Sequence, residues 1–285
     1  MHKKIIITAE TGSDLTEEMA KALGVYLVPM HVSMGNVTKD DGSFPAEEVC
    51  DYYNRTKKVP KTSGSTPADF ELVFAKIRRD HPGKQILHLA YSAVTTCAYQ
   101  SAVIASEGNE LISIVDTKHV SVGQAYVVML VRKYLNEHPE TGLKEAAEYA
   151  SYISKRVQMC FIPNNLDYLR AGGRVSNAAS LVGNILKLHP CIEIIDGKLM
   201  AQKKYRGNLN SIMPKLMEDF CEKYSLLKDE VYLITTPGLS KESMDLAEET
   251  ARKAGFKNIH WMKTGCVITC HGGPGAYGIV GLSKI

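Results

Sequence analysis

The 285-residue sequence lacks most features that mark the specialised classes of protein. It has no C-x-x-C pair, and its seven cysteines are widely scattered, which favours reduced thiols over a disulfide framework. No apolar run approaches the roughly 18 residues that a membrane-spanning helix needs. The opening run Ile5-Ile6-Ile7 is also too short for the core of a signal peptide. We therefore expect a cytoplasmic protein without stable membrane insertion.

An excess of charge of one sign is also missing. The chain has 34 basic and 31 acidic residues, a formal net charge of +3, and no dense basic cluster with interleaved aromatic residues. This balance argues against a nucleic-acid partner. The composition, 45% apolar and 23% charged, is close to the globular average and excludes a disordered or collagen-like chain. The length allows one large domain or two of about 140 residues.

The usual motifs for metal, nucleotide and nucleophile chemistry are absent as well. Cys266-x-x-x-Cys270-His271 comes nearest to a metal pattern, but no second ligand pair stands at a plausible spacing. We interpret residues 266–270 as a buried strand in which the cysteines act as small apolar residues. No Gly-Lys-Ser/Thr follows a glycine run, so the chain has no P-loop to bind the phosphates of a nucleotide. There is no G-x-S-x-G elbow, H-E-x-x-H or kinase signature. We expect no cofactor.

Gly273, Gly275 and Gly278 match the G-x-G-x-x-G spacing of dinucleotide-binding turns. Only seven residues follow Gly278, too few for the crossover helix, second strand and acidic residue of that fold. We interpret these glycines as positions where the backbone turns tightly or approaches a ligand. His271, just before them, suits a hydrogen-bonded structural histidine and a ligand-facing one equally well.

In the first half of the chain, predicted strands and helices alternate. The helix predicted at 67–79 has the clearest pattern, with apolar residues at i, i+3, i+4 and i+7, Thr66 as N-cap and Asp69 at N3. Asp14 is predicted to cap the first helix, which runs to residue 23. This order predicts a mainly parallel sheet flanked by helices. The other segments are strands at 5–8, 25–32, 85–90 and 111–115, and helices at 46–53, before 106 and at 121–137.

The second half predicts a different organisation. Asp196-Gly197 separates two apolar segments and is the favoured two-residue hairpin turn, which implies antiparallel pairing. We therefore predict an α/β protein of two domains: an N-terminal α/β domain at 1–157 and a C-terminal α+β domain at 158–285. The predicted elements of the second domain are helices at 178–188, 211–224 and 241–254, and strands at 191–195, 198–203, 231–235, 259–262 and 266–270.

Two loops rich in hydroxyl groups are candidates for a binding site. Residues 61–67, Lys-Thr-Ser-Gly-Ser-Thr-Pro, lead directly into a helix, whose N-terminus offers free N–H donors and partial positive charge. Residues 91–96, Tyr-Ser-Ala-Val-Thr-Thr, follow a strand and precede another helix. Either loop alone is explained by ordinary N-capping. Together, at the edge where ligands collect in open α/β sheets, they favour a shared site for a carboxylate or phosphate.

Six segments, in order, resemble the DegV family of fatty-acid-binding proteins, which present acyl chains to a bacterial fatty acid kinase. The first differs from the family's Asp-Ser-x-x-Asp-Leu start at Glu10 and Gly12, and in the second Ser65 replaces the usual proline. The fifth, which includes a Gly-Gly turn between two arginines, and the sixth match most closely. The segments are 8–15, 59–67, 99–102, 116–118 with 123–124, 166–174 and 271–275.

The resemblance implies a fatty acid such as palmitate bound between the two domains, with its carboxylate held by hydroxyl groups and its tail in an apolar tunnel. Thr62 and Ser63 match the first loop of the family's head-group site. Ser92 matches the first serine of the second loop, and Thr96 replaces a later serine. His271 matches a histidine near the head group.

The resemblance also implies a protein partner. Arg206 lies where family members carry basic residues thought to meet the kinase, so the chain is expected to be a carrier and presenter and not the catalyst. Ala93 stands where the family often has a second serine, and Cys97-Ala98 replaces Gly-Thr. These changes are expected to alter the detailed head-group geometry.

The leading hypothesis is therefore a lipid-binding protein of lipid metabolism. Burying about fourteen methylenes of a sixteen-carbon chain is worth roughly 11 kcal/mol before association costs. The tail can thus supply the affinity while neutral hydroxyls orient the carboxylate. The alternative is an enzyme acting on a small carboxylated or phosphorylated substrate at the same strand edge. A third possibility is a protein-interaction module with no enclosed cavity.

Overall fold

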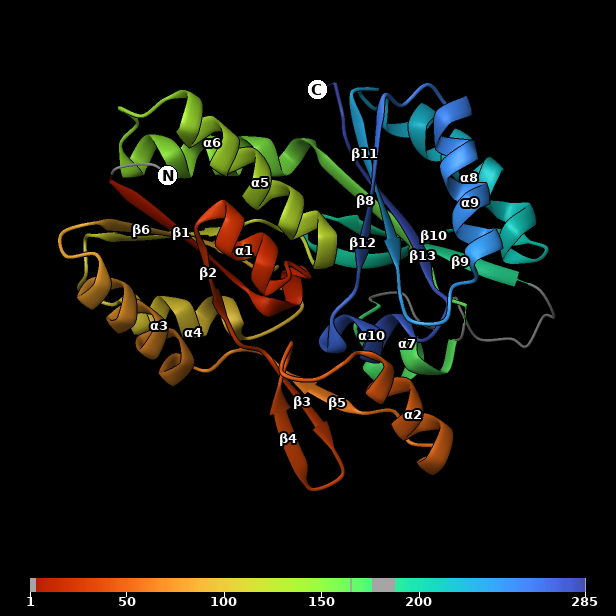
Figure 1. Cartoon of the computed structure of the whole chain (residues 1–285), viewed down its shortest axis with the longest axis horizontal. Coiled ribbons are helices and arrows are strands. Elements are labelled where there is room, and N and C mark those ends of the chain that lie inside the picture. Colours follow the sequence, from red (N-terminus) through yellow and green to blue (C-terminus); the bar gives the residue numbers. More distant parts are fainter. Residues whose placement is uncertain (1–3, 165, 176–187, 285) are drawn as a thin grey trace. The chain divides into compact units, whose positions relative to one another are not determined.

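The structure, a computed structural model, describes residues 4–164, 166–175 and 188–284 (Figure 1). The chain forms two compact units. The first consists of Met1–Phe44 and Thr62–Lys155, and the second of Pro45–Lys61 and Arg156–Ile285. No helix within these described ranges is both long enough and apolar enough to cross a membrane.

A four-stranded sheet forms the centre of the first unit. Its order is β2-β1-β6-β7, and all three neighbouring pairs are parallel, which confirms the predicted parallel sheet. The central strand β1 is buried at every residue, so its sequence is a nearly continuous apolar run without alternation. The strands are β1 (Ile5–Glu10), β2 (Val25–Val28), β6 (Gln85–Ala90) and β7 (Ile112–Asp116).

Helices cover both faces of this sheet, as predicted (Figure 1). α3 and α4 pack against each other on one face, while α1 and α5 lie on the other. α6 stacks on α5 through Tyr149 and Tyr134, whose ring centroids are 3.8 Å apart. The helices are α1 (Glu17–Leu23), α3 (Pro67–Asp80), α4 (Ala98–Ser106), α5 (Ser121–Glu137) and α6 (Leu143–Arg156), with a short 3-10 helix, η1 (Thr11–Ser13).

The capping predictions have mixed outcomes. The Thr66 side chain accepts from the Asp69 N–H, and the Asp69 side chain accepts from the Thr66 N–H, which confirms the predicted cap of α3. The prediction that Asp14 caps the first helix is wrong, because Thr16 caps α1. Asp14 adopts a left-handed conformation after η1, and its carboxylate accepts a hydrogen bond from the hydroxyl of Ser121. That partner is 107 residues away, so no local pattern reveals it.

A small second sheet in the first unit has the order β4-β3-β5. Its strands are β3 (His31–Met34), β4 (Val37–Asp40) and β5 (Lys61–Ser63). The single strand predicted at 25–32 is wrong, because β2 and β3 belong to different sheets. Pro29 separates them: it has no N–H for a ladder, and its carbonyl accepts from Ser65 Oγ at 2.7 Å.

The second unit contains a six-stranded sheet of order β10-β9-β8-β13-β11-β12. Only β11 and β12 pair in parallel, which confirms an α+β organisation. The predicted hairpin joins β9 and β10 through Asp196 and Gly197, whose φ angles are 47° and 81°. The strands are β8 (Val157–Ile162), β9 (Leu188–Ile195), β10 (Lys198–Arg206), β11 (Glu230–Thr235), β12 (Asn258–Lys263) and β13 (Tyr277–Leu282).

Residues 266–270 are helical, so the strand predicted there is wrong. They belong to α10 (Cys266–Gly272), five of whose seven residues are buried. The partly exposed side carries the apolar Ile268 as well as His271, so the apolar residues of this short helix do not form the one-sided stripe that predicts a helix. The helix predicted at 178–188 lies outside the described residues except for Leu188, which begins β9. The other helices of this unit are α2 (Glu47–Thr56), α7 (Leu166–Gly172), α8 (Leu209–Tyr224) and α9 (Lys241–Lys253).

The core of the second unit contains a tyrosine whose hydroxyl is unsatisfied. Tyr277 is 1% exposed, packs with Ile279, Leu233 and Met217, and its hydroxyl has no hydrogen-bond partner in the described chain. By contrast, the Tyr205 hydroxyl in the same core donates to Asp219 at 2.7 Å. A buried hydroxyl without a partner costs roughly 1–3 kcal/mol.

We therefore expect Tyr277→Phe to raise the free energy of unfolding by about 1 kcal/mol, because it removes an unpaired polar atom and keeps the ring. Urea unfolding followed by circular dichroism measures the change. Tyr205→Phe is the matched control and should lower stability by about 1 kcal/mol through loss of its hydrogen bond. Equal destabilisation by both substitutions would contradict the prediction.

Candidate functional site

The first hydroxyl loop begins on β5 and ends at the start of α3. Thr62 is half-buried and Ser63 is exposed. Ser65 is fully buried, and its hydroxyl is committed to the Pro29 carbonyl. Ser65 therefore anchors the loop, while Thr62 and Ser63 are the hydroxyl residues nearer the surface.

The second hydroxyl loop connects β6 to α4. Ser92 is fully buried, its N–H donates to the His119 carbonyl at 2.9 Å, and its carbonyl accepts from Thr95 Oγ1 at 2.8 Å. Thr96 is half-buried, and its Oγ1 accepts from the Ala98 N–H at 3.4 Å. Thr96 thus lies at the N-terminus of α4 and still has a hydroxyl proton to donate.

The two loops touch at Gly64 and Thr96. A Cβ atom added to Gly64 would lie 2.2 Å from Thr96 Oγ1 and 3.3 Å from the Ala98 nitrogen. Only a residue without a side chain permits this approach while Thr96 keeps its position. The sequence analysis named Thr62, Ser63, Ser92 and Thr96 but missed Gly64, which gave no local signal beyond being a glycine between hydroxyl residues.

The two adjoining helices differ in what their N-termini offer an anion. At α3, the Asp69 carboxylate accepts from both the N–H and the hydroxyl of Thr66 and also contacts His31 Nε2 at 3.0 Å. Burial raises the pKa of Asp69, but these hydrogen bonds outweigh it and the pKa is lowered. At α4, by contrast, the N-cap residue Cys97 makes no side-chain hydrogen bond, and the group that accepts from the Ala98 N–H is the neutral hydroxyl of Thr96. An incoming carboxylate therefore binds more favourably at the N-terminus of α4, because the Asp69 carboxylate already occupies the N-terminus of α3.

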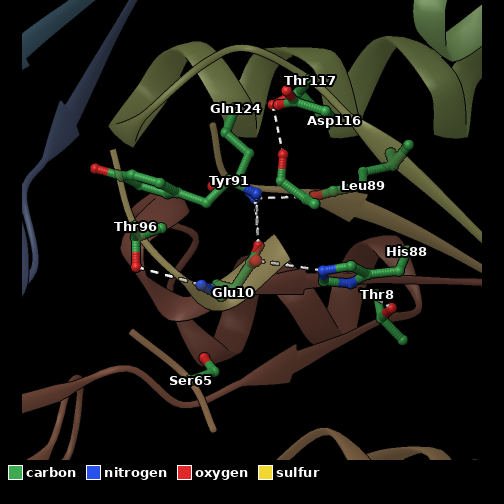
Figure 2. Close-up of polar contacts among 12 residues, drawn as sticks. Thr8, Glu10, Ser65, His88, Leu89, Tyr91, Thr96, Asp116, Thr117 and Gln124 are labelled. Atoms are coloured by element: carbon green, nitrogen blue, oxygen red, sulfur yellow. Dashed lines mark hydrogen bonds and ion pairs between the residues drawn. The ribbon is translucent and has the colours of Figure 1, made fainter. Parts of the chain in front are cut away.

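A buried polar cluster lies beneath the second loop (Figure 2). The Glu10 carboxylate accepts from the Tyr91 N–H at 2.9 Å and from Gln124 Nε2 at 2.7 Å, and it lies 3.3 Å from His88 Nε2. Burial raises the pKa of Glu10, but the charge of His88 and these hydrogen bonds lower it overall. The sequence analysis treated Glu10 only as a departure from a family pattern. An acidic residue ending an otherwise apolar strand was the available signal.

The two remaining predicted residues lie in the second unit. Arg206 is exposed at the end of β10. His271 is half-buried on α10, where a Cβ atom added to Gly172 would lie 2.3 Å from its Nδ1. Gly273 has a φ of 68° and a Cβ there would meet the Tyr168 ring at 2.9 Å, so this glycine permits a close approach to a side chain of the same unit.

The charge state of His271 follows from its surroundings. Burial disfavours the imidazolium, and the nearby positive charge of Arg174 adds to this effect, so the pKa of His271 is lowered to about 4. At neutral pH the imidazole is neutral and can donate or accept one hydrogen bond at each nitrogen according to its tautomer. Within residues 4–164, 166–175 and 188–284, no group of three or more His, Cys, Asp or Glu could hold a metal ion.

Comparisons with known proteins agree with this architecture. A family model described as "Uncharacterised protein, DegV family" matches residues 4–284. A DegV domain-containing protein of Caldanaerobacter subterraneus subsp. tengcongensis is 28% identical, over 97% of this chain and 98% of that protein. A "Fatty acid-binding protein" of Thermotoga maritima is 27% identical, over 96% of each. The structure of a fatty-acid-binding DegV family protein from Thermus thermophilus has the same fold, with a TM-score of 0.85 and 22% identity, over 98% of this chain and 99% of that one.

The lowered pKa of His271 generates a test by titration. We expect its NMR resonance, assigned with a His271→Gln variant, to titrate near pH 4. Because the folded-state pKa lies below the ordinary 6.5, the unfolded chain binds the proton first. The stability that neutral His271 contributes is therefore complete above about pH 6.5 and is lost as the pH falls towards 4.

The wild type should accordingly lose roughly 3 kcal/mol more stability than His271→Gln between pH 7 and pH 4, the free energy that corresponds to a pKa lowered from 6.5 to about 4. Chemical denaturation at the two pH values measures this difference. A midpoint at pH 6.5, or equal losses in the two proteins, would show that the imidazole is not held in its neutral form.

Proposed function

The chain belongs to the DegV family, and from this premise we propose that it binds a long-chain fatty acid whose carboxylate is held by the two hydroxyl loops of the first unit. The contact of Gly64 with Thr96 carries this proposal, because it puts both loops at the N-terminus of α4, where no acidic side chain lies in the first turn. Thr96, Thr62, Ser63 and Ser92 are the proposed head-group residues. The fatty-acid-binding relative from Thermotoga maritima supports the choice of ligand.

Neutral donors suffice for such a head group. A helix N-terminus contributes unpaired N–H groups and roughly half a positive charge, and hydroxyl donors complete the shell of a carboxylate. Each donor must already be in place, since a buried carboxylate with missing partners pays the cost of desolvation. The backbone bonds of Ser92 to His119 and Thr95 provide that fixed arrangement.

The acyl tail supplies most of the affinity in this proposal. About fourteen buried methylenes contribute roughly 11 kcal/mol before association costs, far more than one head-group hydrogen bond. Enclosure of the tail in a tunnel between the two domains, and the approach of His271 to the head group, rest on the family resemblance. Both features are parts of the proposal.

We also propose, on the same resemblance, that a separate kinase phosphorylates the bound carboxylate and that this chain presents the substrate to it. The exposed guanidinium of Arg206 at the end of β10 is the proposed contact with that partner. An enzyme acting on a small carboxylated or phosphorylated substrate at the same loops is the competing function. It predicts a compact polar ligand in place of a long acyl chain.

We expect the purified protein to carry a fatty acid, or to bind added palmitate, when examined by native mass spectrometry and lipid extraction. Thr62→Val and Thr96→Val should each weaken binding by roughly 5–150-fold, the equivalent of 1–3 kcal/mol for an unpaired buried partner. Isothermal titration with palmitate gives the dissociation constants.

Thr38→Val is the matched control, because Thr38 is an exposed threonine on β4 of the same unit and should leave palmitate affinity unchanged. A lipid-free protein that ignores palmitate would overturn the proposal. A bound sugar phosphate or small organic acid in its place would favour the competing enzyme.

Gly64→Ala tests the contact between the loops. The new methyl group must displace the Thr96 hydroxyl, so we expect palmitate affinity to fall by roughly the same 5–150-fold with little change in melting temperature. In a Thr96→Ala background, the same substitution meets no hydroxyl and should cause no further loss. Additive losses in the double variant would contradict the proposed role of this contact.

A further inference from the structure

Four polar side chains of the first unit are completely buried and take no part in the proposed head-group site. We call them the Glu10 cluster: Thr8, Glu10, His88 and Gln124, each 0% exposed. They come from three elements, β1, β6 and α5. Burying a carboxylate is costly unless a charged partner and hydrogen-bond donors surround it.

The geometry shows what the Glu10 carboxylate holds. Thr8 pairs with His88 in the parallel ladder, so Glu10, two residues further on, stands beside the end of β6. From there its Oε2 atom reaches past the strand and accepts from the Tyr91 N–H at 2.9 Å. The carboxylate thus replaces the next rung of the ladder, at the first residue of the second hydroxyl loop (Figure 2).

The other contacts of the cluster fix where that carboxylate sits. Gln124 Nε2 donates both to Glu10 Oε2 at 2.7 Å and to the Leu89 carbonyl at 2.8 Å. His88 Nε2 lies 3.3 Å from Glu10 Oε1, and the His88 Nδ1 atom bonds Thr8 Oγ1 at 2.9 Å. Glu10 is therefore held from α5 and from β6 at the same time.

The neighbouring backbone groups of the loop are held by other elements. The Ala90 carbonyl accepts from both the N–H and the hydroxyl of Thr117, at 3.1 and 2.7 Å. The Ser92 N–H donates to the His119 carbonyl. Tyr91 lies between these fixed points, and its N–H donates to a side chain whose length can be changed by mutation.

We propose that Glu10 is a positioning residue for the carboxylate site: it fixes Tyr91 so that Ser92 and Thr96 present their hydroxyls, without touching the ligand itself. This inference rests on the proposed function. The length of the Glu10 side chain, and not its charge, is the property that this role requires. Asp would withdraw the carboxylate by about 1.5 Å, the length of one carbon–carbon bond. Gln keeps the reach and can still accept from Tyr91 and Gln124, and its amide nitrogen can donate to His88 Nε2 when the neutral imidazole carries its proton on Nδ1, beside Thr8.

The experiment compares Glu10→Asp and Glu10→Gln with the wild type, with the exposed Glu110→Gln as control. Palmitate affinity is measured by titration, and the Tyr91 amide is followed by its ¹⁵N–¹H resonance and hydrogen exchange. We expect Glu10→Asp to lose roughly tenfold in affinity, about 1.4 kcal/mol, and to lose protection at Tyr91. Glu10→Gln should restore the protection and most of the affinity, and Glu110→Gln should match the wild type.

The amide readout separates positioning from general destabilisation. Loss of affinity in Glu10→Asp with an unchanged Tyr91 amide would overturn the inference, as would Glu10→Gln binding as weakly as Glu10→Asp. Should Glu10→Asp fail to fold, Gln124→Met tests the same arrangement, because it removes the hydrogen bond from α5 that holds the Glu10 carboxylate. We expect this variant to lose part of the hydrogen-exchange protection of the Tyr91 amide. Full protection of that amide would contradict the inference. If the wild type binds no fatty acid, the proposed function fails, while the Tyr91 amide still reports whether Glu10 holds the loop.

Discussion

A carboxylate that leaves water must find its hydrogen-bond donors already fixed, and the proposed head-group site depends on this constraint. The two hydroxyl loops meet where Gly64 allows Thr96 to approach, at a helix N-terminus without an acidic residue in its first turn. The neighbouring helix α3 differs, since the Asp69 carboxylate already occupies its N-terminus. In the proposal, α3 thus holds an anion of its own and α4 receives the anion of the ligand.

Fixing the donors in advance requires support from outside the loop. Ala90, Tyr91 and Ser92 are held in turn by Thr117, Glu10 and His119: Glu10 ends β1, and the other two lie in the connection between β7 and α5. The buried pair of Glu10 and His88 belongs to this support. Its cost is offset by the donors that surround the carboxylate, which also lower its pKa.

The sequence predicted those features that local chemistry determines. The capping box at Thr66 and Asp69 and the turn at Asp196-Gly197 each depend on neighbouring residues, and both were identified. Asp14 and Glu10 could not be interpreted in the same way, because their partners are far along the chain. The strand predicted at 266–270 failed for another reason: the apolar Ile268 lies on the partly exposed side of α10, so this helix has no one-sided apolar stripe that distinguishes it from a strand.

The departures from the family pattern at 93, 97 and 98 bear on the same constraint. They replace side chains and leave backbone N–H groups in place: Ala93 donates to Asp116 Oδ1 at 3.3 Å and Ala98 donates to Thr96 Oγ1. Ala98 is fully buried, and a Cβ atom on Gly64 would lie 3.4 Å from its methyl group. The small residue at 98 and the hydroxyl of Thr96 therefore both face the space that Gly64 leaves open, and they are parts of one arrangement.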